Sequence, residues 1–555
     1  MSTVRLEAVA PASREVPMQP ASLDIWDKKY RLKTKQGEPV DADIDATYQR
    51  VARALADAEA DTARQAYWYE RFLWALRRGA IPAGRITSNA GAQEHKPKTS
   101  TINCTVSGTI EDSMDGILDK VHEAGLTLKA GCGIGYEFST LRPRGAYVSG
   151  AGAYTSGPLS FMDIYDKMCF TVSSAGGRRG AQMGTFDVSH PDVREFIRAK
   201  REDGRLRQFN LSLLITDGFM QAVEADAEWP LVFPVHVHEA DEVALADAAT
   251  VVWREWPTSR NYVTRDDGLV ACRIYGQIRA RHLWDMIMVS TYDYAEPGFI
   301  LIDKVNEMNN NWWCENIRAT NPCGEQPLPP YGACLLGSIN LARLVRQPFA
   351  ADAGIDGAEL DSLVRTAVRM MDNVVDASKF PLPQQAEEAR LKRRIGLGVT
   401  GLADALLMMG LRYGSDGAVA QTRDWMRAIA RAAYLASVDL AREKGAFPLF
   451  DAQKFLASGT MRAMDADVRD AIATHGIRNA LLTSIAPTGT ISLYAGNVSS
   501  GIEPVFAYAY SRKVLQPDGS RSEEEVVDYA VQMWRDLKGD APLPDYFVSA
   551  QTLAP

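Results

Sequence analysis

Two amphipathic helical patterns stand near the start of the chain. Apolar side chains recur at helical spacing over residues 44–58 and again over 62–76, where aromatic residues supply a packing face. We therefore predict a helical N-terminal region over residues 23–98. The preceding residues, 1–22, are rich in Pro, Ala, Ser and Glu, and we expect them to form a flexible leader.

Apolar strands then alternate with helices along most of the chain. The segment 99–107 alternates in polarity, is rich in β-branched residues and contains Cys104, which favours a strand. Asp112 and Ser113 are expected to cap a helix that ends near residue 130, and another helix is predicted over 158–174. Further buried strands are predicted over residues 209–215, 231–237, 298–302, 332–341 and 481–485. This alternation predicts an α/β architecture with mostly parallel strands.

One main domain accounts for most of these elements. Residues 99–515 contain no Ser/Gly linker, and no period of about 20 to 50 residues repeats, which excludes a solenoid. The sequence therefore predicts a single α/β domain over 99–515. Residues 516–555 are interpreted as the start of an incomplete C-terminal segment.

Composition and charge narrow the class of protein. The 555 residues are 46% hydrophobic and 24% charged, which is typical of a globular chain with a large core. The net charge of −9 gives no general attraction to nucleic acid or to anionic membranes, so neither is expected as a partner. No run approaches the roughly 18 apolar residues of a membrane span, and the N-terminus lacks a signal-peptide pattern. Seven cysteines, an odd number, do not form a disulfide framework, which predicts a cytoplasmic protein with reduced thiols.

Two motifs lack the sequence context that would give them a function. Gly396-Leu-Gly398-Val-Thr-Gly401 matches a dinucleotide-binding fingerprint, but a basic stretch precedes it where an apolar strand is required. Close helix packing is the expected use of these glycines. His236 and His238 would share one face of a strand, but no third ligand accompanies them. We therefore expect surface histidines and no metal site.

A hydroxyl-rich turn follows the predicted strand at 481–485. Residues 483–492 read Thr-Ser-Ile-Ala-Pro-Thr-Gly-Thr-Ile-Ser. Backbone N–H groups and hydroxyls at the start of a helix can bind phosphate without a fixed charge. The same residues also serve as an ordinary helix cap, so the residues alone leave both interpretations open.

Asp112 and the basic pair Arg178-Arg179 form a third polar group of interest. The carboxylate would suit a sugar hydroxyl or base edge of a nucleotide effector, and the arginines would suit its phosphates. A helix cap and a solvated loop are the competing interpretation, because exposed charges usually have no further role.

The most specific chemistry lies in residues 321–334, which read Asn-Pro-Cys-Gly-Glu-Gln-Pro-Leu-Pro-Pro-Tyr-Gly-Ala-Cys. The prolines and glycines exclude a regular helix or a central strand and stiffen a tight turn. Cys323 and Glu325 flank Gly324, so their side chains can converge on one small ligand. An isolated cysteine is usually a packing residue, but apolar packing does not require Asn321, Cys323 and Glu325 together.

These residues resemble the finger loop of ribonucleotide reductases, in which an Asn-x-Cys-x-Glu segment at the loop tip carries radical chemistry. The sequence from Asn321 onward, which continues to Cys334-Leu-Leu-Gly-Ser-Ile-Asn-Leu341, is most similar to the class II, adenosylcobalamin-dependent branch of this family. The resemblance extends from about Ser22 to the last residue. It implies a ten-stranded α/β barrel of two five-stranded parallel halves, preceded by a helical region, with the finger loop threaded through its centre.

The resemblance implies an enzyme that reduces ribonucleotides to 2′-deoxyribonucleotides. Cys323 matches the thiyl radical position, Glu325 the general base and Asn321 the amide that hydrogen-bonds the sugar. Cys104 and Cys334 match the pair that supplies two electrons and closes to a disulfide. The other cysteines fit no motif and are expected to be packing residues: Cys132, Cys169, Cys272 and Cys314.

The same resemblance assigns the two polar groups left open above. The hydroxyl-rich turn matches the family's substrate-phosphate loop, with candidates Thr488, Gly489, Thr490 and Ser492. Asp112 matches an effector-binding residue. Arg179 and Gln182 match the relay that carries the effector's identity to the substrate base.

The implied cofactor is adenosylcobalamin, from which the radical is generated. The implied partners are a ribonucleotide substrate, a deoxynucleotide or ATP effector, a thioredoxin-like reductant and a second copy of the chain in a homodimer. Full-length class II enzymes continue beyond the position that matches Pro555, with a last barrel strand and a cysteine pair that re-reduces the active site. Either the chain is shortened, or a second polypeptide supplies that part. Two alternatives stay open: a large subunit that uses a separate metalloprotein radical source, and a non-catalytic nucleotide-binding regulatory remnant.

Overall fold

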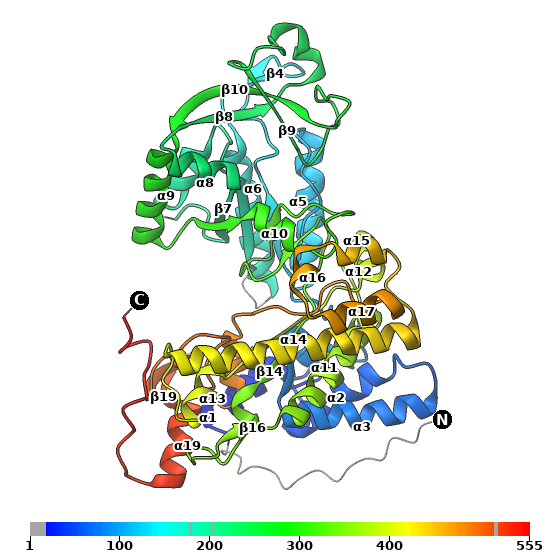
Figure 1. Ribbon diagram of the computed structural model, residues 1–555, viewed down its shortest axis with the longest axis vertical. Coiled ribbons are helices and arrows are strands. Elements are labelled where there is room, and N and C mark those ends of the chain that lie inside the picture. The colour runs from blue at the N-terminus through cyan, green and yellow to red at the C-terminus, as the bar shows by residue number, and fades with distance from the viewer. Residues whose placement is uncertain (1–17, 177–179, 202–203, 516–519, 555) are drawn as a thin grey trace.

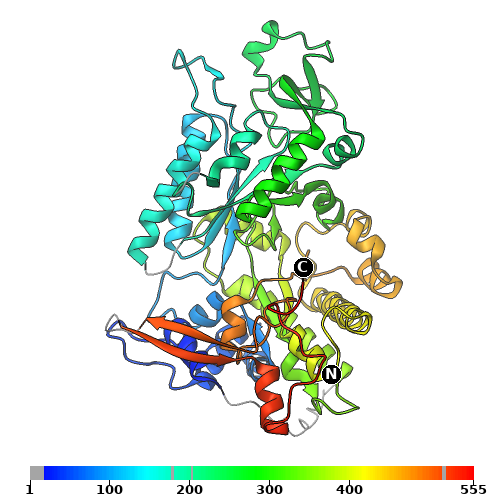
Figure 2. The same cartoon turned by 90° about the vertical axis from the view of Figure 1, so that its left-hand side faces the viewer.

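Two sheets of unequal size organise the chain into two lobes, which lie one above the other in Figure 1. The computed structural model describes residues 18–176, 180–201, 204–515 and 520–554. The upper lobe, cyan to green, contains the larger sheet, and Figure 2 shows helices on both of its faces. The lower lobe combines the N-terminal helices, in blue, with the later helices, in yellow to red.

The larger sheet has five parallel strands in the order β11-β7-β6-β3-β2. Its strands are β2 (Cys104–Val106), β3 (Gly133–Glu137), β6 (Gln182–Asp187), β7 (Phe209–Ile215) and β11 (Gly298–Leu301). The helices of this lobe include α5 (Met114–Lys129), α6 (Pro158–Gly176), α7 (Val193–Arg198), α8 (Asp217–Glu224) and α9 (Ala280–Tyr294). The predicted α/β architecture and the strand at 209–215 are confirmed.

The smaller sheet has three strands in the order β1-β14-β17. β14 (Leu336–Asn340) runs parallel to β17 (Gly396–Thr400) and antiparallel to β1 (Ala80–Pro82). An antiparallel bridge between Thr105 and Ala333 connects it to β2 at the edge of the larger sheet. In the described part of the chain, the larger sheet has five strands and the smaller sheet has three. A ten-stranded barrel is therefore not confirmed.

Two predicted strands differ from the structure. The segment 481–485 forms a single parallel bridge, from Thr483 to Leu397, and no ladder. The segment predicted at 231–237 is β8 (Glu228–Pro234), which pairs antiparallel with β10 (Val270–Arg279) and not with the parallel sheet. Apolar runs of this length do not encode strand direction, because a hairpin partner and a parallel partner bury the same side chains.

The helical N-terminal region is confirmed, with α2 (Ile44–Ala56) and α3 (Thr62–Arg78) at the predicted positions. Asp43 and Asp61 cap these helices, since each carboxylate accepts a backbone N–H from the first turn. α1 (Pro20–Ile25) begins two residues before the expected end of the leader, and residues 1–17 lie outside the described part.

A buried ion cluster joins this region to the lower lobe. Glu59 accepts hydrogen bonds from Arg369 at 2.6 Å and from Asn373, both on α11 (Gly357–Ala377), and Lys444 at the end of α14 (Asp416–Lys444) lies 3.2 Å away. Burial alone would raise the pKa of Glu59, but the Arg369 guanidinium outweighs it and lowers the pKa to about 2. The carboxylate therefore stays ionised and ties α2 to both long helices.

The glycines of the G-x-G-x-x-G motif lie in a strand, which corrects the expected helix packing. Gly396 and Gly398 belong to β17, and a Cβ on Gly398 would lie 2.1 Å from the carbonyl oxygen of Ser484. Gly401 has a positive φ and begins α13 (Leu402–Met408). The motif therefore lets the chain at residue 484 approach the sheet closely.

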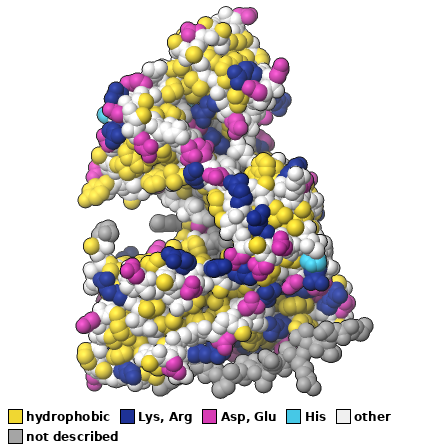
Figure 3. Space-filling view, viewed as in Figure 1, with side chains coloured by type: hydrophobic (Ala, Val, Ile, Leu, Met, Phe, Trp, Pro, Cys, Tyr) yellow, Lys and Arg dark blue, Asp and Glu magenta, His cyan; other side chains and the backbone are white. Residues whose placement is uncertain are grey.

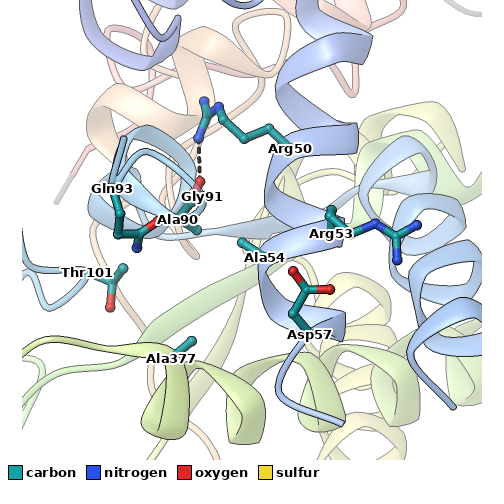
Figure 4. A pocket seen from close by; sticks show the side chains of 9 residues that line it. All are labelled: Arg50, Arg53, Ala54, Asp57, Ala90, Gly91, Gln93, Thr101 and Ala377. Carbon is teal, nitrogen blue, oxygen red and sulfur yellow. Dashed lines mark hydrogen bonds between the residues drawn. The ribbon is translucent and has the colours of Figure 1, made fainter. Parts of the chain in front are cut away.

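A cavity of about 370 Å³ lies in the N-terminal region and is shown in Figure 4. The Arg50 guanidinium at its edge donates to the carbonyl of Ala90 at 2.6 Å and to both oxygens of Asp41. The neighbouring Arg53 lies over the ring of Tyr69. Since Arg50 is fully engaged by protein groups, we interpret this cavity as a packing feature.

The remaining elements complete the two lobes and their connections. They are α4 (Gly84–Asn89), α10 (Ile302–Met308), α12 (Pro383–Lys392), α15 (Ala452–Leu456), α16 (Gly459–Ala463), α17 (Ala466–His475), α18 (Gly489–Tyr494), α19 (Tyr529–Lys538), β4 (Tyr147–Val148), β5 (Ala153–Tyr154), β9 (Val251–Arg254), β12 (Ala319–Thr320), β13 (Pro327–Leu328), β15 (Val345–Arg346), β16 (Gly354–Ile355), β18 (Ala509–Leu515) and β19 (Arg521–Val527). Over the residues described, none of the helices combines the length and apolar character needed to cross a bilayer.

Candidate active site

A short hairpin carries the Asn-Pro-Cys-Gly-Glu segment. β12 and β13 pair antiparallel, and the turn between them closes through a 3.1 Å hydrogen bond from the Asn321 N–H to the Gln326 carbonyl. The Asn321 side-chain oxygen also accepts from the Gln326 N–H at 2.9 Å. Gly324 has φ +85° at the tip, a conformation that favours glycine. The predicted tight turn is therefore present, and its own backbone fixes it.

The larger sheet and the segment beside β17 hold the tip of this hairpin. Asn210 on β7 donates to the Pro322 carbonyl at 2.6 Å, and the Ser484 hydroxyl donates to the Glu325 carbonyl at 3.1 Å. At Gly135 on β3 an added Cβ would lie 1.8 Å from the carbonyl oxygen of Thr320. The glycine therefore lets the hairpin lie directly against the larger sheet.

Buried charges fix the base of the hairpin. The Arg318 guanidinium bonds Glu137 at 2.7 Å and Asp187 at 2.9 Å, and Arg254 also bonds Asp187 at 2.9 Å. Burial disfavours the charge on Asp187, but the two arginines hold the pKa of that carboxyl well below its usual range. These charge-assisted hydrogen bonds hold the base of the hairpin in one position.

The three predicted catalytic cysteines meet at the hairpin. Cys334 donates its backbone N–H to the Cys104 carbonyl at 2.8 Å, so the two residues are neighbours on adjacent chains. A Cβ on Gly133 would lie 2.8 Å from Pro322 and 3.2 Å from the Cys104 sulfur, which brings that sulfur beside the finger tip. Cys334 is buried, Cys104 is half-buried and Cys323 is exposed.

Burial and the neighbouring thiol both raise the pKa of Cys334 well above its usual value. Glu325 and Cys323 add to this shift through their charge, which again shows that the four groups converge. Cys334 therefore rests as a protonated thiol, a form that can donate hydrogen but is a poor nucleophile.

Glu325 is the carboxyl at this site. Burial raises its pKa above 4.5, and the nearby Asn321 amide offsets part of that shift. Within the described residues, Glu325 Oε2 and Asn321 Nδ2 are buried atoms without a hydrogen-bond partner of good geometry. Buried polar atoms of this kind normally have a partner, so they indicate the position of a ligand.

The hydroxyl-rich turn folds close to this tip, four residues after Ser484. Thr488 is left-handed with φ 52°, and its hydroxyl accepts from the Gly501 N–H at 2.7 Å. The Ser492 hydroxyl lies 3.0 Å from that of Ser500. The Thr488 and Ser492 hydroxyls therefore brace the turn. Gly489 and Thr490 are the first residues of α18, and no atom lies within 4 Å of a Cβ added at Gly489. The first N–H groups of α18 have no partner within the helix.

A cavity of about 270 Å³ adjoins the finger tip. Glu325 and Arg394 supply polar atoms to its wall, and Met308, Ile317 and Leu481 supply apolar surface. Arg394 is bound by Glu315, but its Nε is buried and has no hydrogen-bond partner among the described residues. This cavity was not predicted, because its walls come from seven separate stretches of chain.

The predicted effector residues do not form one cluster. Asp112 accepts two bonds from Arg142, at 3.1 and 2.8 Å, and lies 3.4 Å from His236 Nε2 at the carboxyl end of the sheet. Gln182 begins β6 at the opposite end, where it accepts from the Tyr136 hydroxyl at 2.7 Å. Arg179 and its neighbour Arg178 lie outside the described residues.

Several predicted roles are corrected by these contacts. Ser113, not Asp112, caps α5, since its hydroxyl accepts the Gly116 N–H at 3.0 Å. His236 precedes a 3-10 helix, η3 (Val237–Glu242), and contacts Asp112, so it is not a simple strand-surface residue. Cys132, Cys169 and Cys272 are buried as expected, but Cys314 is exposed and does not pack. Among the described residues, no group of three or more His, Cys, Asp or Glu side chains is arranged to hold a metal ion.

Some functional contacts lay outside the sequence analysis. Asn210 and Arg318 position the hairpin, yet no local motif contains them, because their partners are over 100 positions away. Ser484 lies in the hydroxyl-rich segment 483–492, but its bond to the finger tip was not predicted. Gly135 did leave a signal, since alternate glycines within an apolar strand indicate close approach of another backbone.

Family comparisons agree with this geometry. Residues 102–540 match the barrel domain of ribonucleotide reductase, and residues 18–95 match the all-alpha domain of the same family. The chain therefore belongs to the ribonucleotide reductase family.

Similar proteins narrow the comparison within the family. The chain is 37% identical over 506 residues to the vitamin B12-dependent ribonucleoside-diphosphate reductase of Mycobacterium tuberculosis (strain CDC 1551 / Oshkosh), which covers 90% of this chain and 64% of that protein. It is 35% identical to the protein of the same name from Thermoplasma acidophilum, over 73% of this chain and 46% of that protein. The large subunit from Vaccinia virus is 27% identical over 77% of this chain and 55% of its own length. The chain thus spans less than two thirds of these relatives.

Proposed function

We propose that this chain reduces ribonucleoside diphosphates to 2′-deoxyribonucleoside diphosphates. The observation that carries the proposal is the convergence of Cys104, Cys334, Cys323 and Glu325 at one fixed hairpin tip. In the overall reaction the 2′-hydroxyl leaves as water and a dithiol is oxidised to a disulfide, so that two electrons pass to the sugar. The two relatives with the higher identities carry the name ribonucleoside-diphosphate reductase, which supports the diphosphate as substrate.

The exposed tip residue, Cys323, is proposed to act as a thiyl radical that removes the 3′-hydrogen of the ribose. Glu325 then takes the 3′-hydroxyl proton as general base, and the Asn321 amide hydrogen-bonds the sugar. Their unpaired buried atoms, Glu325 Oε2 and Asn321 Nδ2, support these two contacts. The hydrogen bonds from Asn210 and Ser484 keep the tip in place while the substrate reacts.

Cys104 and Cys334 are proposed to be the reducing pair. Their adjacent backbones suit disulfide closure, and the protonated state of Cys334 suits hydrogen donation. A thioredoxin-like dithiol would reduce the disulfide again after each turnover, and half-buried Cys104 gives it access. Such chemistry requires a reducing compartment, which supports a cytoplasmic protein.

The turn at residues 488–492 is proposed to bind the substrate diphosphate. The first amides of α18 would supply the hydrogen bonds, while Thr488 and Ser492 hold the turn in shape. The turn begins four residues after Ser484, whose hydroxyl bonds the Glu325 carbonyl at the finger tip. This supports a substrate whose ribose lies at the tip and whose diphosphate lies at the turn.

The names of the relatives support vitamin B12 as the cofactor, and the residues near the tip fit part of it. The cavity of about 270 Å³ is slightly smaller than sites that enclose a whole drug-sized ligand, about 300–1,000 Å³. It fits a nucleoside-sized arm, with the unpaired Arg394 Nε as a polar contact. When bound, adenosylcobalamin supplies the radical that oxidises the Cys323 thiol.

The two sheets are proposed to be the two halves of a ten-stranded barrel. β11 is an edge strand of the larger sheet, and its Phe299 and Leu301 side chains are 47% and 45% exposed. Figure 3 shows a deep hollow between the lobes, with hydrophobic side chains along its upper border. An exposed apolar edge of this kind pairs readily with another strand, so further strands, in the same or a second polypeptide, would complete the barrel.

A nucleotide effector is proposed to bind at the carboxyl end of the larger sheet, near Asp112. Arg142 and His236 already contact this carboxylate and would define one wall of the site. Gln182 would relay the effector's identity by anchoring the start of β6 to Tyr136. Arg179 lies outside the described residues and keeps its predicted role.

A homodimer through α5 and α6 is supported by their exposed apolar side chains. Met114, Leu118 and Leu126 share one face of α5, and Ile164 and Phe170 lie exposed on α6. Several exposed apolar side chains on two packed helices are typical of a protein interface.

We expect Leu118→Glu to convert the dimer into monomers, because a charge in an apolar interface weakens association by at least about tenfold. Sedimentation equilibrium measures the change. Tyr292→Glu is the matched control, since Tyr292 is an exposed apolar residue on α9. Equal dimer affinity in the two variants would rule out this face.

The pH dependence of hydrogen abstraction should follow Glu325. Because burial raises the pKa of Glu325 above 4.5, the fraction of ionised base and hence the rate rise with pH through that raised value, and the activity is lost below it. Glu325→Gln should lower the single-turnover rate by about 10²–10⁴-fold and remove the acid limb. Rates measured from acid to neutral pH test this, and an unchanged acid limb in the Gln variant would assign it to another group.

The proposed activity is tested by single-turnover reduction of a ribonucleoside diphosphate by dithiothreitol-reduced protein, with and without adenosylcobalamin. Deoxynucleotide formed only with the cofactor would support the activity and the B12 dependence together. Product formed only with an added metalloprotein radical source would favour the alternative of a large subunit. Bound substrate without product in either case would contradict catalysis by this chain.

A further inference from the structure

Two carboxyl groups lie buried together behind the phosphate turn. Asp404, in the first turn of α13, has no exposed surface, and Asp528, which caps α19, is 3% exposed. No Lys or Arg forms an ion pair with either of them within the described residues, although most buried acids have such a partner. The pair therefore needs another explanation.

The two side chains satisfy each other. Asp528 Oδ2 accepts the Ala530 and Val531 N–H groups at 3.0 and 3.2 Å, as a helix cap does. Asp404 Oδ1 lies 3.4 Å from the same Ala530 N–H group, so the two carboxyl groups converge on one donor. Burial raises the pKa of both groups, to about 6 for Asp404 and further for Asp528, and the charge of Asp404 adds to the shift at Asp528. Two carboxyls in contact cannot both ionise in a buried site, so one proton is shared.

Asp404 does not cap its own helix but reaches across to Ser499. Its Oδ2 accepts the Ser499 N–H at 2.6 Å, and the Ser499 hydroxyl in turn accepts the Ala403 N–H at 3.1 Å. The Ser499 carbonyl accepts from the Thr400 hydroxyl at 2.9 Å and from the Gly401 N–H at 2.8 Å. Hydrogen bonds therefore hold the N–H, the carbonyl and the hydroxyl of Ser499.

The two residues after Ser499 are the ones that brace the phosphate turn. The Ser500 hydroxyl lies 3.0 Å from that of Ser492, and the Gly501 N–H donates to the Thr488 hydroxyl at 2.7 Å. Thr488 has a left-handed backbone, which is strained for a threonine and needs such support. A displaced Ser499 would release both braces at once.

We infer that Asp404 and Asp528 form a proton-sharing carboxyl pair that positions the phosphate turn through Ser499. This inference rests on the proposed role of that turn in binding the substrate diphosphate. The pair acts on substrate only through backbone geometry, so both are positioning residues. It also couples α19 to the active site, since any shift of the helix N-terminus displaces Asp528.

The two Asp→Asn variants should behave differently. Asn at 528 can still accept the helix N–H groups with its oxygen and donate to Asp404 with its amide, so it replaces the protonated acid. The partners of Asp404 are all donors: the Ser499 N–H, the Ala530 N–H and the shared proton of Asp528. In Asp404→Asn the side-chain NH₂ group, itself a donor, would face at least one of them. We expect Asp404→Asn to weaken binding of a ribonucleoside diphosphate by about tenfold or more, and the conservative Asp528→Asn to stay within about threefold of the unchanged protein.

Equilibrium dialysis of the full chain with a ribonucleoside diphosphate and with the matching nucleoside separates the possible outcomes. A selective loss of diphosphate affinity in Asp404→Asn, with nucleoside affinity retained, supports the inference. Diphosphate affinity equal to that of the unchanged chain overturns it. If the unchanged chain binds both compounds equally, the proposed phosphate turn itself fails. Asp451→Asn, the same exchange at an aspartate on α15 outside this network, is the control for loss of a carboxylate charge alone.

A second measurement applies even if Asp404→Asn does not fold. Infrared difference spectra of the unchanged chain against Asp528→Asn should contain the band of one buried carboxylic acid, lost in the variant. Absence of that band, or loss of diphosphate affinity in Asp528→Asn, overturns proton sharing. Thermal unfolding of both variants checks that the fold is retained.

Discussion

We expect Cys323→Ala to abolish deoxyribonucleotide formation and to leave ribonucleotide binding unchanged. Cys323 is exposed at the tip of a hairpin held by its own backbone, by Asn210 on the larger sheet and by Ser484, so removing the sulfur should not disturb the fold. In the proposed mechanism the variant has no thiol at the tip from which a thiyl radical can form. The expected loss in single-turnover rate is at least about 10⁴-fold, the scale seen when an essential nucleophile is removed.

Cys314→Ala is the matched control for this result, because Cys314 is also an exposed cysteine but lies outside the hairpin. Its rate should equal that of the unchanged chain. Substrate affinity, measured by equilibrium dialysis, should be the same in all three proteins. Residual cofactor-dependent product in Cys323→Ala would contradict the thiyl assignment and would require another residue to remove the 3′-hydrogen.

Gly135→Ala should displace the whole finger hairpin. An added Cβ would lie 1.8 Å from the Thr320 carbonyl oxygen, and neither group can move easily, since one lies in a central strand and the other opens the hairpin. Overpacking of this kind costs about 1–3 kcal/mol or more in stability. A displacement of about 1 Å at the tip lowers the rate by about 10²-fold.

Thermal unfolding and single-turnover rates measure the two effects of this change. Gly276→Ala is the control, because Gly276 also lies in a strand but has no atom within 4 Å of an added Cβ. It should retain stability and rate. A Gly135→Ala protein with normal activity would mean that the hairpin is not held against the larger sheet as described.

Local motifs were sufficient for the chemistry of the tip. Asn321, Cys323 and Glu325 lie within five residues on a turn that proline and glycine impose, so their convergence follows from short-range geometry. The helices at 44–58 and 62–76 were likewise predictable, because each has its own periodicity and an aspartate cap. The sequence also identified the hydroxyl-rich turn, though not which of its hydroxyls brace it.

Long-range contacts were not predictable from the same signals. Asp112 matched an effector residue, but its partners Arg142 and His236 lie 30 and 124 positions away. The strand direction at 231–237 was wrong for the same reason, since pairing depends on which segment arrives beside it. The exposure of Cys314 depends on the surrounding surface and not on its neighbours in sequence.

By itself, the sequence determined the tight turn that brings Asn321, Cys323 and Glu325 together, and the alternation of strands and helices. Only the tertiary structure decided that Gly135 and Gly398 admit other backbones, that Ser484 bonds the finger tip and that Asp404 meets Asp528. The physical reason is that turns and helices are fixed by interactions within a few residues. Close backbone approach and the pairing of buried charges arise only where distant segments pack together.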